Sequence, residues 1–227
     1  MIGEPVALTV RKHIERPSKA LLKAFTGKPT GYVTDAYNGA GCLDTAIKPL
    51  ESRMRFCGPA VTAFCGPMDN LAAMAILDFV SKGDVIVIAT TGDRTAATIG
   101  DLWAFWARRL GVAAIVCDGL VRDVPGLLKV GIPVFARGAK PNSSFKHGPG
   151  EINMGVSCGG VIIKPGDIVA GDQDGVVAVA LDRAEQVATQ LEEVERREAA
   201  AEAKVRRGEK LSFWNPASLE GRIRYVD

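Results

Sequence analysis

Short apolar runs alternate with amphipathic segments through the middle of the chain. The runs DVIVIA at residues 84–89 and AAIVCD at 113–118 are almost continuously apolar and have the length of a buried strand. Between them, IGDLWAFWARRLG has helical periodicity and ends at Gly111. Buried strands that alternate with helices are typical of a parallel sheet covered on both faces. The pattern therefore predicts a βαβ crossover over residues 84–118.

Further strands and helices are predicted on both sides of this crossover. Helical spacing is found at residues 17–25, 31–39, 68–83 and 124–131, and strand-length runs at residues 59–65 and 132–136. Residues 159–180 contain three short strands separated by turns at Pro165–Gly166 and at 171–175, and residues 138–151 form a long loop. These elements together predict an α/β fold.

A different pattern begins at Leu181. The side chains of Ala184, Val187, Leu191 and Val194 form one apolar stripe, while Glu and Arg occupy the other faces. This pattern predicts one long helix that ends near residue 207. Because no linker or solenoid repeat divides the chain, we expect a single domain over residues 1–227. Its core would span about 30–180, and the C-terminal helix and tail 181–227.

The composition is that of an ordinary globular protein. Of the 227 residues, 47% are hydrophobic and 24% charged, and 28 Lys and Arg nearly balance 26 Asp and Glu. Because no field of one sign dominates, we expect a small-molecule ligand, with neither nucleic acid nor a membrane as partner. The five cysteines contain no C-x-x-C pair and the first residues no export signal, so we expect reduced core thiols and a cytoplasmic location.

One segment concentrates the candidate chemistry. Residues 92–123, GDRTAATIGDLWAFWARRLGVAAIVCDGLVRD, place Asp101 at the start of the predicted helix and Arg122 and Asp123 just past the next strand. Ligands of α/β sheets bind where strands end and helices begin, so we expect Asp101 to face Asp123. Two simpler interpretations stay open at this point: Asp101 as a helix cap, and Arg122–Asp123 as a surface ion pair.

These residue types suit a carboxylate substrate and a divalent metal. Backbone amides at the helix start around residues 99–103 can hold an anionic oxygen, and the guanidinium of Arg122 can grip a carboxylate through two hydrogen bonds. Asp123 offers a hard oxygen ligand for Mg²⁺ or Mn²⁺. A divalent ion on the keto oxygen of a 2-oxo acid stabilises the enolate formed when the bond beyond C3 breaks, and Asp101 can move the proton.

Other motifs are weaker. The segment from Gly171 to Gly175 resembles the start of a calcium loop, although a hairpin turn explains it better. Trp103, Phe105 and Trp106 form an aromatic helix face, which is usually core or subunit contact. The sequence contains no G-x-G-x-x-G after a strand, no G-x-x-x-x-G-K-[ST] and no G-x-S-x-G, which argues against the common nucleotide and serine-hydrolase sites.

Two long stretches carry a family resemblance. The stretch GDVIVIATTGDRTAATIGDLWAFWARRLGVAAIVCDGLVRDVPGLLKVGIPVFARGAKP, followed by GEINMGVSCGGVIIKPGDIVAGDQDGVVAV, resembles the family shared by 4-hydroxy-4-methyl-2-oxoglutarate aldolases and the regulator of ribonuclease E activity A (the RraA-like family). The resemblance covers roughly residues 30–225. In that family, Asp followed after twenty residues by Arg-Asp marks members with metal-dependent aldolase and oxaloacetate decarboxylase activity. Here the arrangement is Asp101 and Arg122-Asp123.

The resemblance implies a fold, an assembly and a site. The fold would be an αββα sandwich (swivelling β/β/α-like) that assembles as a homotrimer or hexamer, with the site between subunits. Asp123 would bind Mg²⁺ or Mn²⁺, and Arg122 the carboxylate and keto region of the substrate. The backbone amides of Gly100, Asp101, Leu102 and Trp103 would bind the pyruvoyl group, and Asp101 would hold the metal-bound water that protonates the enolate. A neighbouring chain would add a carboxylate, for which Glu193, Glu198 and Glu202 are candidates.

The implied activity is that of a class II (metal-dependent) pyruvate aldolase. Such a lyase cleaves 4-hydroxy-2-oxo acids, for example 4-hydroxy-4-methyl-2-oxoglutarate or 4-carboxy-4-hydroxy-2-oxoadipate, to pyruvate and a second oxo acid. Oxaloacetate decarboxylation would be a side activity. The alternative from the same family is a non-catalytic protein that binds and regulates a ribonuclease. The intact Arg122-Asp123 pair favours the enzyme.

Overall fold

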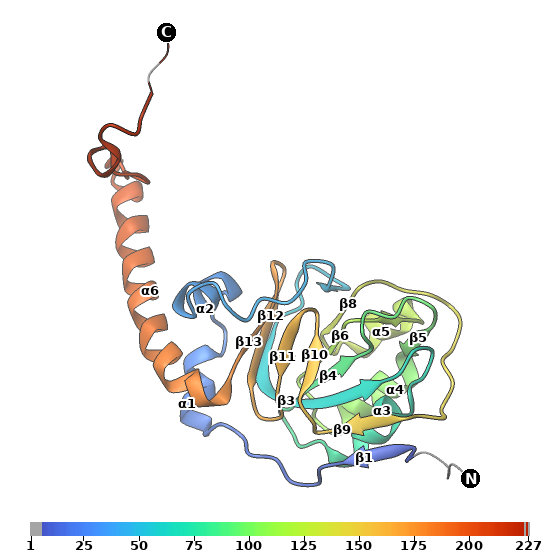
Figure 1. Cartoon of the computed structure of the whole chain (residues 1–227). Helices are drawn as coiled ribbons and strands as arrows, with labels where there is room; N and C mark the ends of the chain where they lie inside the picture. The colour runs from blue at the N-terminus through green and yellow to red at the C-terminus, as the bar shows by residue number, and fades with distance from the viewer. Residues whose placement is uncertain (1–5, 225, 227) are drawn as a thin grey trace.

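The strand β3 (Phe56–Cys65) belongs to two layers of the protein (Figure 1). In a computed structural model that describes residues 6–224 and 226, Ala60–Phe64 pair in parallel with β4 (Val85–Ala89). The beginning of the strand, Phe56–Pro59, pairs antiparallel with β12 (Ile168–Asp172). The strand therefore connects the two sheets. Both limits of the predicted domain, residues 1 and 227, lie outside the described residues.

The predicted βαβ crossover is confirmed. The strand β4 pairs in parallel with β6 (Ala114–Cys117), and α4 (Asp101–Arg109) connects them. The sheet continues through β8 (Val134–Ala136) to the short edge strand β2 (Lys48–Pro49), and on the other side through β3 to β9 (Gly150–Ile152) and β1 (Leu8–Val10). Both faces of β4 are buried, as its continuous apolar sequence predicts.

Within the described residues, three apolar clusters separate four layers. The first cluster lies between the central sheet and the helices α3 (Leu71–Ala75), α4 and α5 (Val124–Val130). The second lies between that sheet and the strands β10 (Val156–Cys158), β11 (Val161–Ile163), β12 and β13 (Gly175–Val179). The third lies between β12–β13 and the helices α1 (Lys19–Phe25), α2 (Thr30–Ala36) and α6 (Ala184–Arg206). The order α, β, β, α confirms the predicted sandwich.

The long C-terminal helix is also confirmed. Its predicted stripe of Ala184, Val187, Leu191 and Val194 is buried, and α6 packs through it against α1 and α2. A 3₁₀ turn, Leu181–Arg183, precedes the helix. The second half of α6 leaves the body of the protein, and the tail continues beyond it (Figure 1). In the described part of the chain, no helix is both long and apolar enough to cross a membrane.

Some predicted elements differ from the observed ones. The helix expected at 68–83 ends early, because α3 passes into the 3₁₀ turn Ile76–Phe79 and the Ser81 amide donates to the Asp84 carboxylate at 2.7 Å instead of continuing the helix. The strands β1, β5 (Ala97–Ile99), β7 (Leu120–Val121), β9 and β10 were not predicted. They contain two or three residues each, too few to show periodicity.

The cysteines are free thiols, and most of them lie in the core. Cys65, Cys117 and Cys158 are buried, whereas Cys42 is exposed, so the expectation of a core thiol was wrong for Cys42. Burial raises the pKa of Cys65 and of Cys117 to about 12. These thiols therefore stay protonated at neutral pH and are poor nucleophiles.

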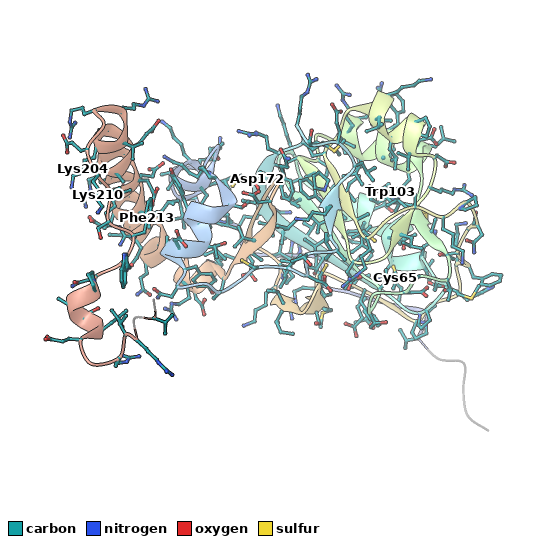
Figure 2. All side chains as sticks on the ribbon, turned by 90° about the horizontal axis from the view of Figure 1, so that it is seen from above. Cys65, Trp103, Asp172, Lys204, Lys210 and Phe213 are labelled. Carbon is teal, nitrogen blue, oxygen red and sulfur yellow. The ribbon has the colours of Figure 1, made fainter. Side chains whose placement is uncertain are left out.

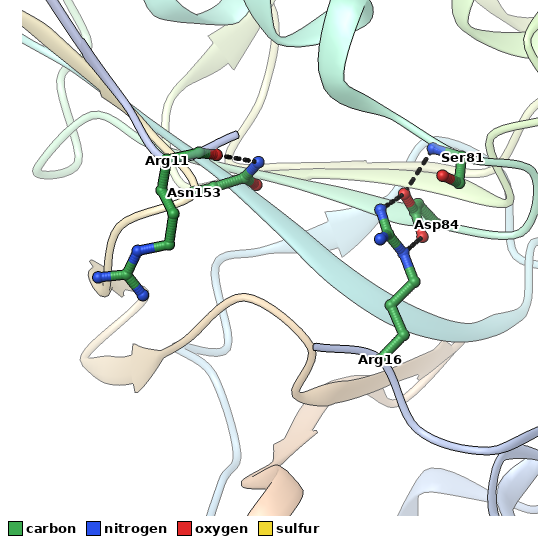
Figure 3. A network of polar contacts seen from close by, with 5 residues as sticks. All are labelled: Arg11, Arg16, Ser81, Asp84 and Asn153. Atoms are coloured by element: carbon green, nitrogen blue, oxygen red, sulfur yellow. Dashed lines mark hydrogen bonds and ion pairs between the residues drawn. The ribbon is translucent and has the colours of Figure 1, made fainter. Parts of the chain in front are cut away.

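Polar contacts fasten the N-terminal segment to the central sheet (Figure 3). The guanidinium of Arg16 donates from Nε to Asp84 Oδ1 at 2.9 Å and from Nη2 to Oδ2 at 2.8 Å. The Asp84 side chain is 1% exposed, so the bidentate partner compensates for burying its charge. Further along, Asn153 Nδ2 donates to the backbone oxygen of Arg11 at 3.1 Å.

Candidate functional site

Two short parallel strands bring the predicted site residues together. The strand β5 leads into Gly100 and Asp101, and β7 leads into Arg122 and Asp123. The strands pair with each other, and the Arg122 amide donates to the Ile99 oxygen at 3.0 Å. We had expected the ends of β4 and β6 to align these residues directly. The structure instead inserts this separate pair of strands after β4 and β6.

Glycine backbones allow the two carboxylates to pack closely into the site. A Cβ atom added to Gly100 would lie 2.5 Å from Asp123 Oδ2, and one added to Gly126 would lie 2.1 Å from Asp101 Oδ2. Any larger residue at either position would collide with a carboxylate that the site places there. The close approach explains why these positions are glycine.

Asp123 has an unusual backbone conformation. It precedes α5 with a φ of 59°, in the left-handed region that residues other than glycine adopt at a cost. Asp tolerates this region better than most residues. The left-handed turn carries the chain from β7 into α5 and presents the carboxylate to the backbone of Gly100.

The guanidinium of Arg122 is held from two sides. Its Nε lies 3.2 Å from Asp123 Oδ2, and its Nη1 donates to Ser143 Oγ. The side chains of Arg122 and Asp123 are 41% and 44% exposed, so this ion pair contributes little to stability. Because a guanidinium has five N–H donors, its terminal edge retains donors for a ligand.

The loop after β8 forms another wall of the site. The Ala97 amide donates to the Asn142 oxygen at 3.0 Å, and Ser144 Oγ donates to the Ala97 oxygen at 3.0 Å. These bonds fix the loop beside β5 and bring Ser143 and Lys146 to the cavity. The unusual length of the loop was the only sequence signal for these two residues, and neither was predicted as a site residue.

The start of α3 forms the remaining wall. Asn70 and Met74 line the cavity there, and Trp103 Nε1 donates to the Ala73 oxygen at 2.9 Å, which ties α4 to α3. The cavity measures about 180 Å³, which is small beside the sites that hold drug-sized ligands. It is lined by Asn70, Met74, Ala97, Thr98, Ile99, Gly100, Asp101, Leu102, Trp103, Arg122, Asp123, Ser143 and Lys146. Every residue predicted for the site is among them.

Asp101 also serves its own helix. Its Oδ1 accepts a hydrogen bond from the Leu102 amide at 2.7 Å in the first turn of α4. The N-cap position itself is Gly100, and the helix has no side-chain cap hydrogen bond, so Asp101 is not the helix cap. The Leu102 amide is nevertheless not free for a ligand, contrary to expectation. A ligand anion would have to replace the Asp101 carboxylate at that amide.

The donor set at the cavity fits a hard divalent ion. Mg²⁺ and similar ions keep several waters and use one or two protein carboxylates together with substrate oxygens. Asp101 and Asp123 supply such carboxylates. Among the described residues, no group of three or more His, Cys, Asp and Glu side chains could hold a metal by itself. The residues thus suit Mg²⁺ or Mn²⁺ better than a closed zinc site.

The calcium-like segment is a hairpin, as its turn residues predicted. Asp172 pairs with Gly175 across the antiparallel ladder of β12 and β13. The Asp172 carboxylate accepts bonds from the Thr30 amide at 2.9 Å and from Thr30 Oγ1 at 2.7 Å. This carboxylate therefore joins the hairpin to α2.

The fold agrees with the comparisons with known proteins. The chain belongs to the RraA-like family, described as Aldolase/RraA, whose pattern matches residues 30–178. It is 40% identical over 182 residues to a protein of Halalkalibacterium halodurans that is provisionally named a 4-hydroxy-4-methyl-2-oxoglutarate aldolase. That match covers 80% of this chain and 85% of the relative.

Solved structures include both close and partial matches. The Streptomyces coelicolor protein RraAS2 is described as an unusual member of the RNase ES inhibitor RraA protein family. It is 26% identical with a TM-score of 0.76, and the match covers 83% of this chain and all of that one. The RNA-processing inhibitor RraA of Thermus thermophilis is 29% identical with a TM-score of 0.62, over 68% of this chain and 93% of that one. These proteins share the fold described above.

Proposed function

We propose that this protein is a metal-dependent lyase, a class II pyruvate aldolase, that cleaves 4-hydroxy-2-oxo acids. The observation that carries the proposal is the meeting of Arg122 with the carboxylates of Asp101 and Asp123 in one small cavity. The name of the Halalkalibacterium relative supports it. Substrates of this class include 4-hydroxy-4-methyl-2-oxoglutarate and 4-carboxy-4-hydroxy-2-oxoadipate.

The reaction needs no external reagent. The C3–C4 bond breaks, its electron pair forms the enolate of pyruvate, and C4 becomes a carbonyl as its hydroxyl loses a proton. Protonation of the enolate at C3 then gives pyruvate. Decarboxylation of oxaloacetate releases CO₂ and leaves the same enolate, so one site performs both reactions. A bound divalent cation would supply the positive charge that stabilises the enolate.

The residues of the cavity divide this chemistry between them. The free edge of the Arg122 guanidinium binds the substrate carboxylate and keto region. Asp101 moves the proton at C3, and Asp123 would hold Mg²⁺ or Mn²⁺. The backbone amides of Gly100, Asp101 and Trp103 at the start of α4 bind the pyruvoyl group, where the helix dipole favours an anion. The Leu102 amide joins them when the ligand replaces the Asp101 carboxylate, which accepts its hydrogen bond in the structure.

The proposed enzyme works as a homotrimer or hexamer. Leu102, Phe105 and Trp106 on α4 are 83%, 50% and 52% exposed beside the cavity, an apolar surface that a second copy of the chain would cover. The residues Glu193, Glu198 and Glu202 belong to α6, which lies on the opposite side of the molecule from α4 (Figures 1 and 2). They can therefore reach only the cavity of a neighbour.

Oxaloacetate decarboxylation tests the proposal. Purified protein is assayed with Mg²⁺ and with EDTA, beside Asp123→Ala and the exposed-carboxylate control Asp78→Ala. We expect activity that requires the metal, and a loss of about 100-fold or more in Asp123→Ala, since removing a ligand costs at least as much as removing its supporting contacts. Asp78→Ala should match the wild type. Full activity of Asp123→Ala would refute the metal assignment.

The second candidate is a ribonuclease regulator without catalytic activity. The names of the Streptomyces and Thermus proteins favour it. Correctly assembled, metal-loaded protein that acts on neither oxaloacetate nor a 4-hydroxy-2-oxo acid would decide for this alternative.

A further inference from the structure

Asn70 occupies a helix N-cap position without capping the helix. It precedes α3, yet its side chain makes no cap hydrogen bond. The neighbouring Asp69 Oδ1 accepts the Leu71 amide at 2.8 Å instead. Asn70 is 7% exposed, and its Nδ2 donates to the Thr98 oxygen at 2.8 Å. The Asn70 side chain therefore bonds to Thr98 in the wall of the cavity and not to the amides of its own helix.

This contact fixes the orientation of the Asn70 amide. The Thr98 carbonyl oxygen can only accept, so the NH₂ group must face it and Oδ1 must point elsewhere. Oδ1 is buried and has no hydrogen-bond partner. An unsatisfied buried acceptor costs free energy, which a ligand can recover by donating to it.

Only one of the residues with such an atom lines the cavity. In the part of the chain that the structure describes, the buried side-chain atoms without a partner are Asn70 Oδ1, Arg137 Nε and Asn153 Oδ1. Asn70 lines the cavity with Asp101, Arg122 and Asp123, whereas Arg137 and Asn153 do not. The unsatisfied acceptor thus coincides with the site that other observations had already defined.

The chemistry of the substrate identifies the partner of Asn70. In an ionised 4-hydroxy-2-oxo acid, the carboxylates and the keto oxygen only accept hydrogen bonds, and the 4-hydroxyl is the donor. We propose that Asn70 Oδ1 accepts a hydrogen bond from this hydroxyl, which makes Asn70 a specificity-determining residue for 4-hydroxy substrates. This inference rests on the proposed lyase function. Asn70 orients the hydroxyl and, being a neutral amide, does not remove its proton.

The hydroxyl reaches Asn70 through a wall that can adjust. Oδ1 is covered in this structure, but the cavity is also lined by the unbranched side chains of Met74 and Lys146. Such side chains change rotamer at low cost. The proposal requires such a change to expose Oδ1 to the hydroxyl.

Two substrates separate this role from the rest of catalysis. Oxaloacetate lacks the 4-hydroxyl but passes through the same enolate, so it serves as an internal reference. For Asn70→Ala we expect kcat/KM for cleavage of 4-hydroxy-4-methyl-2-oxoglutarate to fall about 10-fold, the equivalent of one hydrogen bond. Decarboxylation of oxaloacetate should stay within about 2-fold, since the lost bond is absent from that reaction.

Asn153→Ala is the matched control. Asn153 is also buried, and its Nδ2 also donates to a backbone oxygen, that of Arg11 (Figure 3). Its Oδ1 is also unpaired, but Asn153 is not among the residues that line the cavity. Its replacement should leave the ratio of the two activities unchanged. Asn70→Ser covers the case in which the alanine variant does not fold, because serine suits an N-cap position. It should show the same change in ratio, since its side chain is shorter.

The outcomes separate the two proposals. If both reactions fall equally in Asn70→Ala and Asn70→Ser, the residue is structural and the inference is overturned while the lyase function stands. If Asn70→Ala keeps full activity in both reactions, so that their ratio is unchanged, the inference is also overturned and the lyase function stands. If wild-type protein performs neither reaction, the proposed function fails and the inference fails with it. A selective loss of aldol cleavage supports both.

Discussion

Gly126 lies in α5 against the side chain of Asp101, where a Cβ atom would lie 2.1 Å from Oδ2 and 2.7 Å from the Asp101 Cβ and Cγ. Because Cβ moves only with the backbone, the Asp101 side chain cannot avoid the added methyl group by rotation alone. If Asp101 has the proposed catalytic role, Gly126→Ala should lower kcat/KM for oxaloacetate by about 10-fold or more, since misplacing a catalytic group is costly. Steady-state kinetics beside thermal unfolding would measure both effects.

Gly31 provides the control for this substitution. It also lies in a helix, α2, and a Cβ added to it would meet no atom within 4 Å. Gly31→Ala should therefore keep full activity, and it should gain up to about 1 kcal/mol of stability from helix propensity. Equal losses of activity in the two variants would show that the collision with Asp101 is not the cause.

The second prediction at the scale of residues concerns Arg122. Its pair with Asp123 is about half exposed, so Arg122→Ala should change the free energy of unfolding by less than about 1 kcal/mol. Loss of the guanidinium should nevertheless raise the inhibition constant of pyruvate about 10-fold or more, because charge-assisted bonds to a carboxylate are strong. Competitive inhibition assays measure this constant. An unchanged value would count against a role in carboxylate binding.

The sequence predicted part of the site for a physical reason. Asp101, Arg122 and Asp123 follow strands of one crossover, so their meeting depends on local periodicity and on general rules of α/β sheets. Asn70 and Lys146 were not predicted. Their position at the cavity depends on hydrogen bonds between segments far apart in the chain. One of these is the bond that the backbone N–H of Asn70 donates to the backbone oxygen of Phe145 at 2.8 Å. No local pattern encodes such a contact.

At the scale of elements, Asp172 joins α2 to the β12–β13 hairpin. Partial burial acts to raise the pKa of Asp172. The bonds from the amide and hydroxyl of Thr30, together with those from the Asp174 and Gly175 amides, outweigh it, so the pKa lies below its ordinary value. A lowered pKa in the folded state means that the ionised carboxylate stabilises the fold. This stability is complete above the unfolded pKa of about 4 and is lost as the pH falls through the lower folded value.

Asp172→Ala tests this coupling. We expect the variant to lose roughly 1–2 kcal/mol of stability at pH 7, typical of hydrogen bonds to a charged group. The difference from wild type should shrink as the pH falls from about 4 through the lower folded pKa, where the wild-type carboxylate becomes protonated. Urea unfolding at a series of pH values measures the difference. A constant difference from pH 7 down to pH 3 would contradict the assignment.

Whether a helix or strand could be predicted from the sequence depended on its length. Long periodic segments such as α4 and α6, and continuous apolar runs such as β4, were identified from sequence because burial imposes a repeating pattern on them. The strands β5 and β7 were missed, although they align the site. Two or three residues cannot display a period, and such strands exist only because the neighbouring segments supply their partners.

At the scale of the whole molecule, the sandwich leaves the cavity beside an uncovered apolar surface. Phe105 and Trp106 lie on the outward side of α4, where burial within one chain is impossible because the sheet lies on the other side of the helix. The helix α6 and the tail, with Phe213 89% exposed, extend away at the opposite end (Figure 2). Symmetric assembly of identical chains would cover such surfaces at no cost to the fold of each chain.

Trp106→Glu tests whether α4 is an interface. A charge placed in an apolar contact between subunits must be desolvated without a partner, so we expect the oligomer to dissociate to smaller species while the fold of each chain persists. Sedimentation velocity measures the assembly, and circular dichroism the fold. The matched variant Arg109→Glu, which also adds negative charge to α4 but replaces an exposed charged side chain, should dissociate less.

If the neighbour completes the cavity, activity in Trp106→Glu should fall with the fraction of intact oligomer. A fully active monomer would show that one chain contains the whole site.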